Sequence, residues 1–107
     1  MTDKTKKQLM QYLHKLAEHY QIPNATLVSF KKRNLLLELL STKDETAFEI
    51  MKDVIESAMI LDRIQNDTEK QTKKPEHWNE EVDIAKKVVS FTQEKLNAFI
   101  KSEGISN

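Results

Sequence analysis

Three histidines are the side chains in this sequence best suited to acid–base chemistry or metal binding. His14 and His19 stand five residues apart, so on one helix they point in different directions. Two ligands on the same helix reach one ion only when they stand about three or four residues apart. His77 has that spacing with Glu80 or Glu81, but this pair lacks the further ligands that a metal site needs. We therefore predict no metal site and no cofactor.

The residue patterns of other catalytic sites do not occur in the sequence either. No glutamate has a histidine three residues after it, although di-iron helical bundles use that spacing. Gly104 is the single glycine, which excludes a glycine-rich phosphate loop, and there is no cysteine. No neighbouring base singles out a nucleophile among Ser29, Ser41, Ser57 and Ser90. We predict that the protein is not an enzyme.

The composition indicates a helical protein of one domain. The chain has 107 residues, of which 38% are hydrophobic and 32% charged, which is enough for one compact core. One glycine and two prolines are few for the turns of a sheet protein, which favours long helices with short connections. No apolar run approaches membrane-spanning length, and no N-terminal run resembles a signal peptide. We therefore expect a single domain over 1–107, no membrane partner and a cytoplasmic location.

Apolar periodicity predicts four helices, over residues 3–20, 25–40, 44–66 and 75–102. Pro23 ends the first helix, and Asn24 is the expected N-cap of the second. Thr42 and Glu45 have the spacing of a capping box at the start of the third. The polar stretch 66–74 is the expected flexible loop. Four amphipathic helices with short connections predict an all-α fold, a small four-helix bundle-like domain with antiparallel helices.

The predicted second helix carries apolar residues on more than one side. Val28, Leu35 and Leu39 lie apart from the side that holds Leu27 and Leu37. A helix that is apolar on two sides is usually buried on two sides, so we expect residues 25–40 to form the central helix. Apolar surface left over on this helix also makes the protein a candidate homodimer.

The stretch from Leu16 to Phe30, followed by a basic cluster, resembles the helix-turn-helix of small repressors over about fifteen residues. The resemblance implies that the start of the second helix faces base edges and that the basic cluster contacts phosphates. The candidate DNA contacts are Asn24, Thr26, Ser29, Lys31, Lys32 and Arg33. Gln21 stands where the turn usually has a left-handed glycine, at a cost of roughly 1 kcal/mol.

Charge is unevenly distributed along the chain. Residues 1–33 contain seven bases and two acids, a net charge of +5, whereas the remainder contains ten bases and fifteen acids, a net charge of −5. Residues 43–69 alone contain three bases and eight acids. An acidic helix of this kind steers a basic partner toward it, and a basic N-terminal part suits nucleic acid.

Two functions are compatible with these patterns. The first is a small non-enzymatic helical regulator or adaptor of the inhibitor, immunity or anti-activator type, which binds an unidentified protein partner. Its candidate interface residues are Val28, Leu35, Leu39 and Trp78. The alternative is a dimeric helix-turn-helix regulator that binds duplex DNA through residues 16–33.

Overall fold

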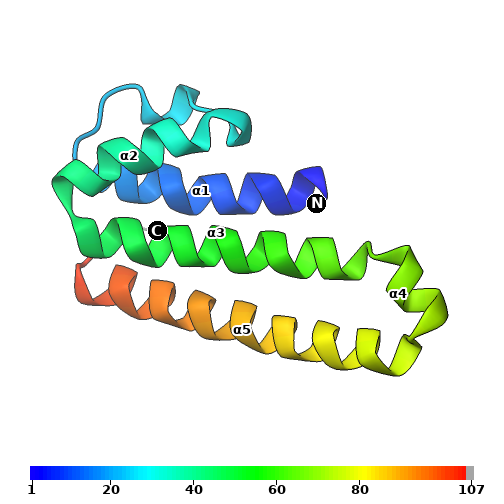
Figure 1. The fold of residues 1–107 in the computed structure, drawn as a ribbon. Coiled ribbons are helices and arrows are strands. Elements are labelled where there is room, and N and C mark those ends of the chain that lie inside the picture. Colours follow the sequence, from blue (N-terminus) through cyan, green and yellow to red (C-terminus); the bar gives the residue numbers. More distant parts are fainter. Residues whose placement is uncertain (106–107) are drawn as a thin grey trace.

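A computed structural model describes residues 1–105, and its regular elements are all helical. The α-helices are α1 (Asp3–His19), α2 (Arg33–Lys43), α3 (Glu45–Gln65), α4 (Thr68–Lys73) and α5 (Pro75–Ser102). Two 3-10 turns, η1 (Ala25–Leu27) and η2 (Phe30–Lys32), separate α1 from α2 (Figure 1). The predicted all-α class is confirmed, although the described residues form five α-helices where four were expected.

The end of α1 is closed by a Schellman turn. Gln21 adopts a left-handed conformation with φ of 60°, and its N–H donates to the carbonyl of Glu18 at 3.0 Å. The N–H of Ile22 donates to the carbonyl of Ala17 at 2.9 Å, and the Ile22 side chain is buried. These two bonds satisfy carbonyls at the end of the helix that would otherwise lack a partner. Gln21 therefore adopts the left-handed conformation that glycine adopts most readily.

The helix predicted over residues 25–40 is wrong in its first part, because α2 begins at Arg33. The expected N-cap, Asn24, is left-handed with φ of 57° and makes no capping bond, and Val28 and Ser29 are extended. His14 supplies the physical reason, since its Nε2–H donates to the carbonyl of Val28 at 2.9 Å. That long-range bond fixes Val28 in a non-helical position, and the chain resumes helical geometry only after η2.

The helices α1 and α2 run in the same direction. At their N-terminal ends, Lys6 Nζ lies 5.7 Å from the centre of the Phe30 ring. At their C-terminal ends, the Tyr20 hydroxyl donates to Asp44 Oδ2 at 2.6 Å. Residues 21–32 carry the chain back along α1 before α2 begins (Figure 1). This segment therefore replaces the short connection expected between the first two helices.

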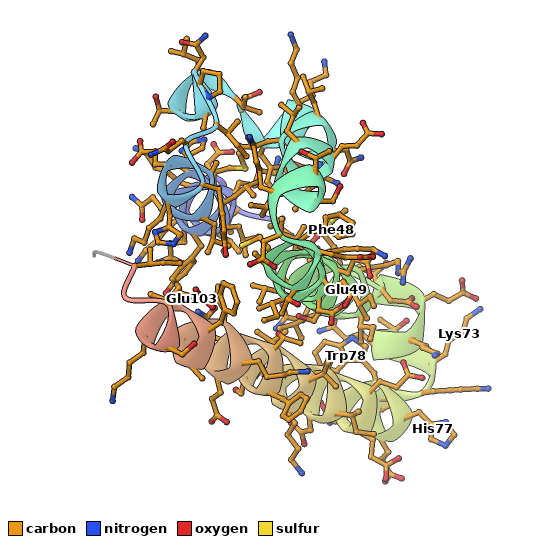
Figure 2. All side chains as sticks on the ribbon, turned by 90° about the vertical axis from the view of Figure 1, so that its left-hand side faces the viewer. Phe48, Glu49, Lys73, His77, Trp78 and Glu103 are labelled. Atoms are coloured by element: carbon orange, nitrogen blue, oxygen red, sulfur yellow. The ribbon has the colours of Figure 1, made fainter. Side chains whose placement is uncertain are left out.

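The central helix is α3, whereas the sequence predicted residues 25–40. Figure 2 views the helices from one end and shows α1 and α2 on one side of α3 and α5 on the other. Leu36 and Leu40 of α2 are fully buried against the core, whereas Leu35 and Leu39 are 56% and 44% exposed. The helix α2 is therefore buried on one side only. The core that joins α1, α2, α3 and the end of α5 includes Leu13, Leu16, Leu36, Leu40, Met51 and Leu96.

Asp44 starts α3, which corrects the capping box predicted for Thr42 and Glu45. Its Oδ1 accepts from the backbone N–H of Thr46 at 2.9 Å and from that of Ala47 at 3.2 Å. Because α2 extends through Lys43, Thr42 is still helical and its hydroxyl bonds backward to the Leu39 carbonyl. Asp44 therefore lies at the boundary between the two helices, where its backbone is extended and its side chain caps the N-terminus of α3.

A short helix, α4, occupies the stretch that the sequence predicted as a flexible loop. Its N-cap is Asp67, whose Oδ1 accepts from the backbone N–H of Lys70 at 3.1 Å. Lys70 Nζ in turn lies 2.6 Å from Glu81 Oε1, which ties α4 to α5. Trp78 closes the same end because its indole N–H donates to the Ile64 carbonyl at 2.8 Å. Local capping and these two contacts explain why part of the polar stretch is helical and lies against α5.

The molecule is elongated, with extents of 49 × 27 × 22 Å and a radius of gyration of 15.3 Å. A compact chain of this length would have a radius of about 13 Å. The reason is visible in Figure 1, where α3, α4 and the first half of α5 extend beyond α1 and α2. Part of the contact between α3 and α5 therefore has no third helix over it.

Candidate functional site

Large apolar side chains remain exposed where α3 and α5 pack together. Ile60 of α3 is 44% exposed, and Ile84, Val88 and Phe91 of α5 are 61%, 45% and 60% exposed. Ile84, Val88 and Phe91 recur at the i, i+4, i+7 spacing that places side chains on one face of a helix. Single exposed apolar residues are ordinary, whereas a group on adjacent helices indicates a binding surface.

These side chains surround a hollow of about 520 Å³ between α3 and α5, which we call the α3–α5 groove. The groove is lined by Asp53, Glu56, Ser57, Ile60, Ile64, Glu81, Ile84, Ala85, Val88, Phe91 and Thr92. Two helices supply all of the lining, so its walls are regular structure and not loops. A site built on helices is held more rigidly than one built on loops.

The floor of the groove contains a buried pair of hydroxyl groups. Ser57 Oγ and Thr92 Oγ1 lie 2.9 Å apart, and each also lies 3.0 Å from a carbonyl of its own helix, that of Val54 or Val89. Within residues 1–105, no buried side-chain oxygen or nitrogen lacks a hydrogen-bond partner. The two hydroxyl groups therefore have hydrogen-bond partners within the protein, and a ligand in the groove does not have to supply a polar group to them.

The polar rim of the groove is negatively charged, because its lining includes three carboxylates and no base. Glu81 is paired with Lys70, and this hydrogen bond raises the pKa of the lysine. Glu56 lies 3.9 Å from Lys52, both of them largely exposed, and Asp53 has no ion pair among the described residues. A long, exposed ion pair such as Lys52–Glu56 is weak, so Asp53 and Glu56 are the acids most available to a partner.

A basic residue stands beside one end of the groove. Lys95 Nζ lies 5.4 Å from the centre of the Phe91 ring, and Lys95 lines a small hollow next to Asp53 and Thr92. The cation lies against the aromatic face, a contact that also shields part of the ring from water. The groove itself is left with apolar walls and an acidic rim.

The predicted interface residues do not form one surface. Leu35 and Leu39 are exposed on α2, on the far side of α3 from α5. Val28 is partly buried against the core, and its carbonyl is bonded to His14. Trp78 is partly buried at the α4 end, where its indole N–H is already bonded to Ile64. Leu35 and Leu39 are neighbours on α2, and neither of them lines the α3–α5 groove.

The candidate DNA contacts lie in the segment that lacks an α-helix. Asn24, Thr26, Ser29, Lys31 and Lys32 are all exposed there, but they are spread over two 3-10 turns and an extended stretch. A helix-turn-helix reads bases with the first residues of an α-helix, and the structure does not place one at residue 25. These residues are therefore accessible without the arrangement that the resemblance implied.

Arg33, the last of the candidate DNA contacts, has structural partners. Its guanidinium lies 4.3 Å from the centre of the Phe30 ring, and one N–H donates to the Phe30 carbonyl at 3.0 Å. The second terminal nitrogen of the Arg33 guanidinium, Nη2, lies 3.4 Å from Met59 Sδ of α3. These contacts hold η2 and the start of α2 against α3.

The three histidines are separated in the structure. His14 is bonded to the Val28 carbonyl, and His19 meets the Tyr20 ring edge to face at 4.9 Å between ring centres. Figure 2 shows His77 pointing away from the helices at the end where α4 meets α5. In residues 1–105, no group of three or more metal-binding side chains is close enough to hold an ion.

A second hollow, of about 1010 Å³, lies between α1 and α5 over the middle of α3. Its walls carry many amide side chains, including Gln8, Gln11, Gln93 and Asn97. Amides keep water in a hollow unless a partner matches their hydrogen bonds, so this surface gains less from desolvation than the α3–α5 groove does.

The sequence interpretation missed the exposed apolar residues Ile60, Ile84, Val88 and Phe91 of the groove. The periodicity that predicts a helix over 75–102 is carried by Val82, Ala85, Val89 and Leu96, and Ile84, Val88 and Phe91 lie outside that stripe. The signal was readable as a second stripe of apolar residues at helical spacing.

Comparison with known proteins supplies no family for this chain. No family model, curated protein or solved structure matches it. Among the described helices, none combines the length and the apolar character required to cross a membrane. The function is therefore inferred from the geometry of the groove.

Proposed function

We propose that this protein is a small non-enzymatic regulator or adaptor, a bundle-like helical scaffold that binds another protein in the α3–α5 groove. The observation that carries the proposal is the group of exposed apolar residues Ile60, Ile84, Val88 and Phe91 around a floor that is already hydrogen-bonded. Such a surface gains free energy when a partner removes it from water and loses little through unmatched polar groups.

The magnitudes support a protein partner. Full burial of one large apolar side chain contributes about 1.5–3 kcal/mol, so burial of the exposed half of four such residues contributes several kcal/mol in all. The accessible surface is 7361 Å², whereas a compact monomer of this mass exposes about 6,200 Å². The difference of about 1,200 Å² follows from the elongated shape, and it exceeds the roughly 800 Å² that each partner buries in an interface of standard size, so the chain has surface enough for one.

The inhibitor, immunity or anti-activator type is the finer form of this proposal. Proteins of these types act by covering a partner, which requires a rigid complementary surface and no catalytic group. Both walls of the groove are long helices, α3 and α5, which supply that rigidity. The acidic charge of α3 would favour encounter with a basic partner.

The test is quantitative co-purification of partners from the native cell with matched variants of the full chain. Ile84→Ser and Phe91→Ser remove exposed apolar groups from the groove, and Leu35→Ser removes one from α2 as a control. We expect the groove variants to lose a specific protein that the wild type and Leu35→Ser both retain. The proposal is contradicted if all three variants retain the same proteins as the wild type.

Duplex DNA is a second candidate partner, on the separate observation that Lys31 and Lys32 are exposed near the basic α1. Fluorescence anisotropy with random-sequence duplex, at about 50 and 200 mM salt, measures that binding. DNA binding that falls steeply with salt and is lost in Lys31→Glu/Lys32→Glu would support it. If the protein does not bind DNA at the lower salt concentration, duplex DNA is excluded as a partner.

A further inference from the structure

We infer that the occupant of the α3–α5 groove is an amphipathic helix of the partner, with Lys or Arg residues along the edge that faces α3. This inference rests on the proposed function and adds the chemistry of the partner segment. It follows from the shape of the groove, from the spacing of its apolar residues and from the position of its carboxylates.

The shape of the groove suits a helix. Its walls extend from Asp53 to Ile64 on α3 and from Glu81 to Thr92 on α5, a length of roughly 17 Å, or three helical turns. Apolar residues at helical spacing on two adjacent helices form ridges between which a third helix packs. The other common mode, addition of a strand to a sheet edge, has no counterpart because residues 1–105 contain no strand.

The charges give the occupant its orientation. Asp53 and Glu56 stand about one turn apart on α3, and both line the groove. A cationic side chain on the near edge of the occupant can reach either carboxylate, while its aliphatic part covers the apolar wall. The wider segment around α3 strengthens the field, because residues 43–69, Asp53 and Glu56 included, contain eight acids and three bases.

A second copy of this chain fits the groove less well than such a helix. The two grooves of a two-fold dimer would face each other, since a two-fold interface uses the same surface on both copies. The lining has three carboxylates and no base, so the contact would bring like charges together. A partner that supplies bases avoids this repulsion.

The test measures binding of the full-length protein to two synthetic peptides by fluorescence anisotropy. Each peptide is an amphipathic helix of about 18 residues with leucines on one face; one has lysines along the edge of that face, and the other has glutamates there. We expect the lysine peptide to bind at least about tenfold more tightly at low salt, with the difference shrinking at about 0.5 M salt.

Variants assign the effect to the groove. Asp53→Lys/Glu56→Lys should reverse the preference, so that the glutamate peptide binds more tightly than the lysine peptide. Ile84→Ser should weaken both peptides about tenfold or more, whereas Leu35→Ser, outside the groove, should leave both unchanged. All four substituted side chains are on exposed positions, so each variant should fold, and circular dichroism is the check.

The outcomes separate this inference from the proposed function. Equal binding of both peptides, lost in Ile84→Ser, would overturn the cationic edge and leave protein binding at the groove supported. Binding of neither peptide would overturn the inference, while co-purification still judges the proposed function. Concentration-dependent dimers that disappear in Ile84→Ser would assign the groove to a second copy and would also overturn it.

Discussion

Ser57 and Thr92 place their hydroxyl oxygens 2.9 Å apart in the buried contact between α3 and α5. Both residues line the floor of the α3–α5 groove, and both are almost fully buried. This hydrogen bond joins the two walls at the level of Val88 and Phe91, where α1 and α2 contribute nothing to the lining. It therefore fixes the spacing of the walls that a partner would meet.

Substitution of this pair should show coupling between the two residues. Ser57→Ala should lower the free energy of unfolding by about 0.5–1.5 kcal/mol, because it removes one buried hydrogen bond. Thr92→Val should have a similar cost, but the double variant should lose less than the two single losses together, since each single change already removes the one hydrogen bond that the two residues share. Urea denaturation of the four proteins measures the coupling, and strict additivity would count against the contact.

Residues of the core and of the groove should differ sharply in their effect on stability. Leu96→Ala and Ile55→Ala should each cost about 2–5 kcal/mol, because both side chains are at least 98% buried. Ile84→Ala should change the free energy of unfolding by no more than about 0.5 kcal/mol, because its side chain is 61% exposed. Chemical denaturation checks all three. A large loss in Ile84→Ala would mean that the groove wall is part of the core.

The left-handed position after α1 offers a stabilising change. Gln21→Gly should raise the free energy of unfolding by roughly 1 kcal/mol, since glycine adopts a φ of 60° without a steric cost. Asn24→Gly is the matched control, because asparagine already tolerates the left-handed region and the gain there should be smaller. Differential scanning calorimetry compares the two; a lower melting temperature for Gln21→Gly would argue against the Schellman turn.

The Tyr20–Asp44 hydrogen bond makes stability depend on pH. The Tyr20 hydroxyl, helped by the N–H groups of Ala47 and Thr46, lowers the pKa of the Asp44 carboxyl. A lowered pKa in the folded state adds stability that is present above the unfolded pKa of about 3.9 and is lost as pH falls through the folded value. Burial, followed by the hydrogen bond to the Asp44 carboxylate, raises the pKa of Tyr20, so the stability that this residue contributes is lost only as the pH rises above its unfolded pKa of about 10.

Asp44→Asn isolates this effect, because asparagine still caps a helix but does not titrate. The wild type should be more stable than Asp44→Asn at pH 7, and the difference should shrink as pH falls below about 4. Unfolding in urea at a series of pH values measures it. A difference that stays constant from pH 7 to about pH 2.5 would show that the carboxylate does not contribute in this way.

The sequence was sufficient for helices whose signals are local. Pro75 at the first position of α5 and the regular apolar spacing of α3 are features that single segments carry in themselves. It was insufficient for residues 25–32, because the bond from His14 to Val28 joins positions that are fourteen residues apart and overrides the helical preference of the segment. It also gave no warning that residues 21–32 return along α1.

The groove was hidden for a related reason. An apolar stripe such as Ile84, Val88 and Phe91 can be read from spacing, but its exposure depends on which helices cover it. The sequence placed residues 25–40 at the centre, which would have covered most apolar faces. In the structure α3 is central, and α1 and α2 lie on its other side (Figure 2). Whether such an apolar stripe is buried therefore depends on how the helices pack, and the spacing of its residues does not decide it.

The most direct test of the central claim is photo-cross-linking in the native cell from position 88. Val88 replaced by p-benzoylphenylalanine places the reactive group in the groove, and Thr26 replaced in the same way places it on the exposed segment after α1. We predict one dominant protein adduct from position 88 that position 26 does not form and that Ile84→Ser removes. Identical adducts from both positions, or none from position 88, would contradict the assignment of the α3–α5 groove as a protein-binding site.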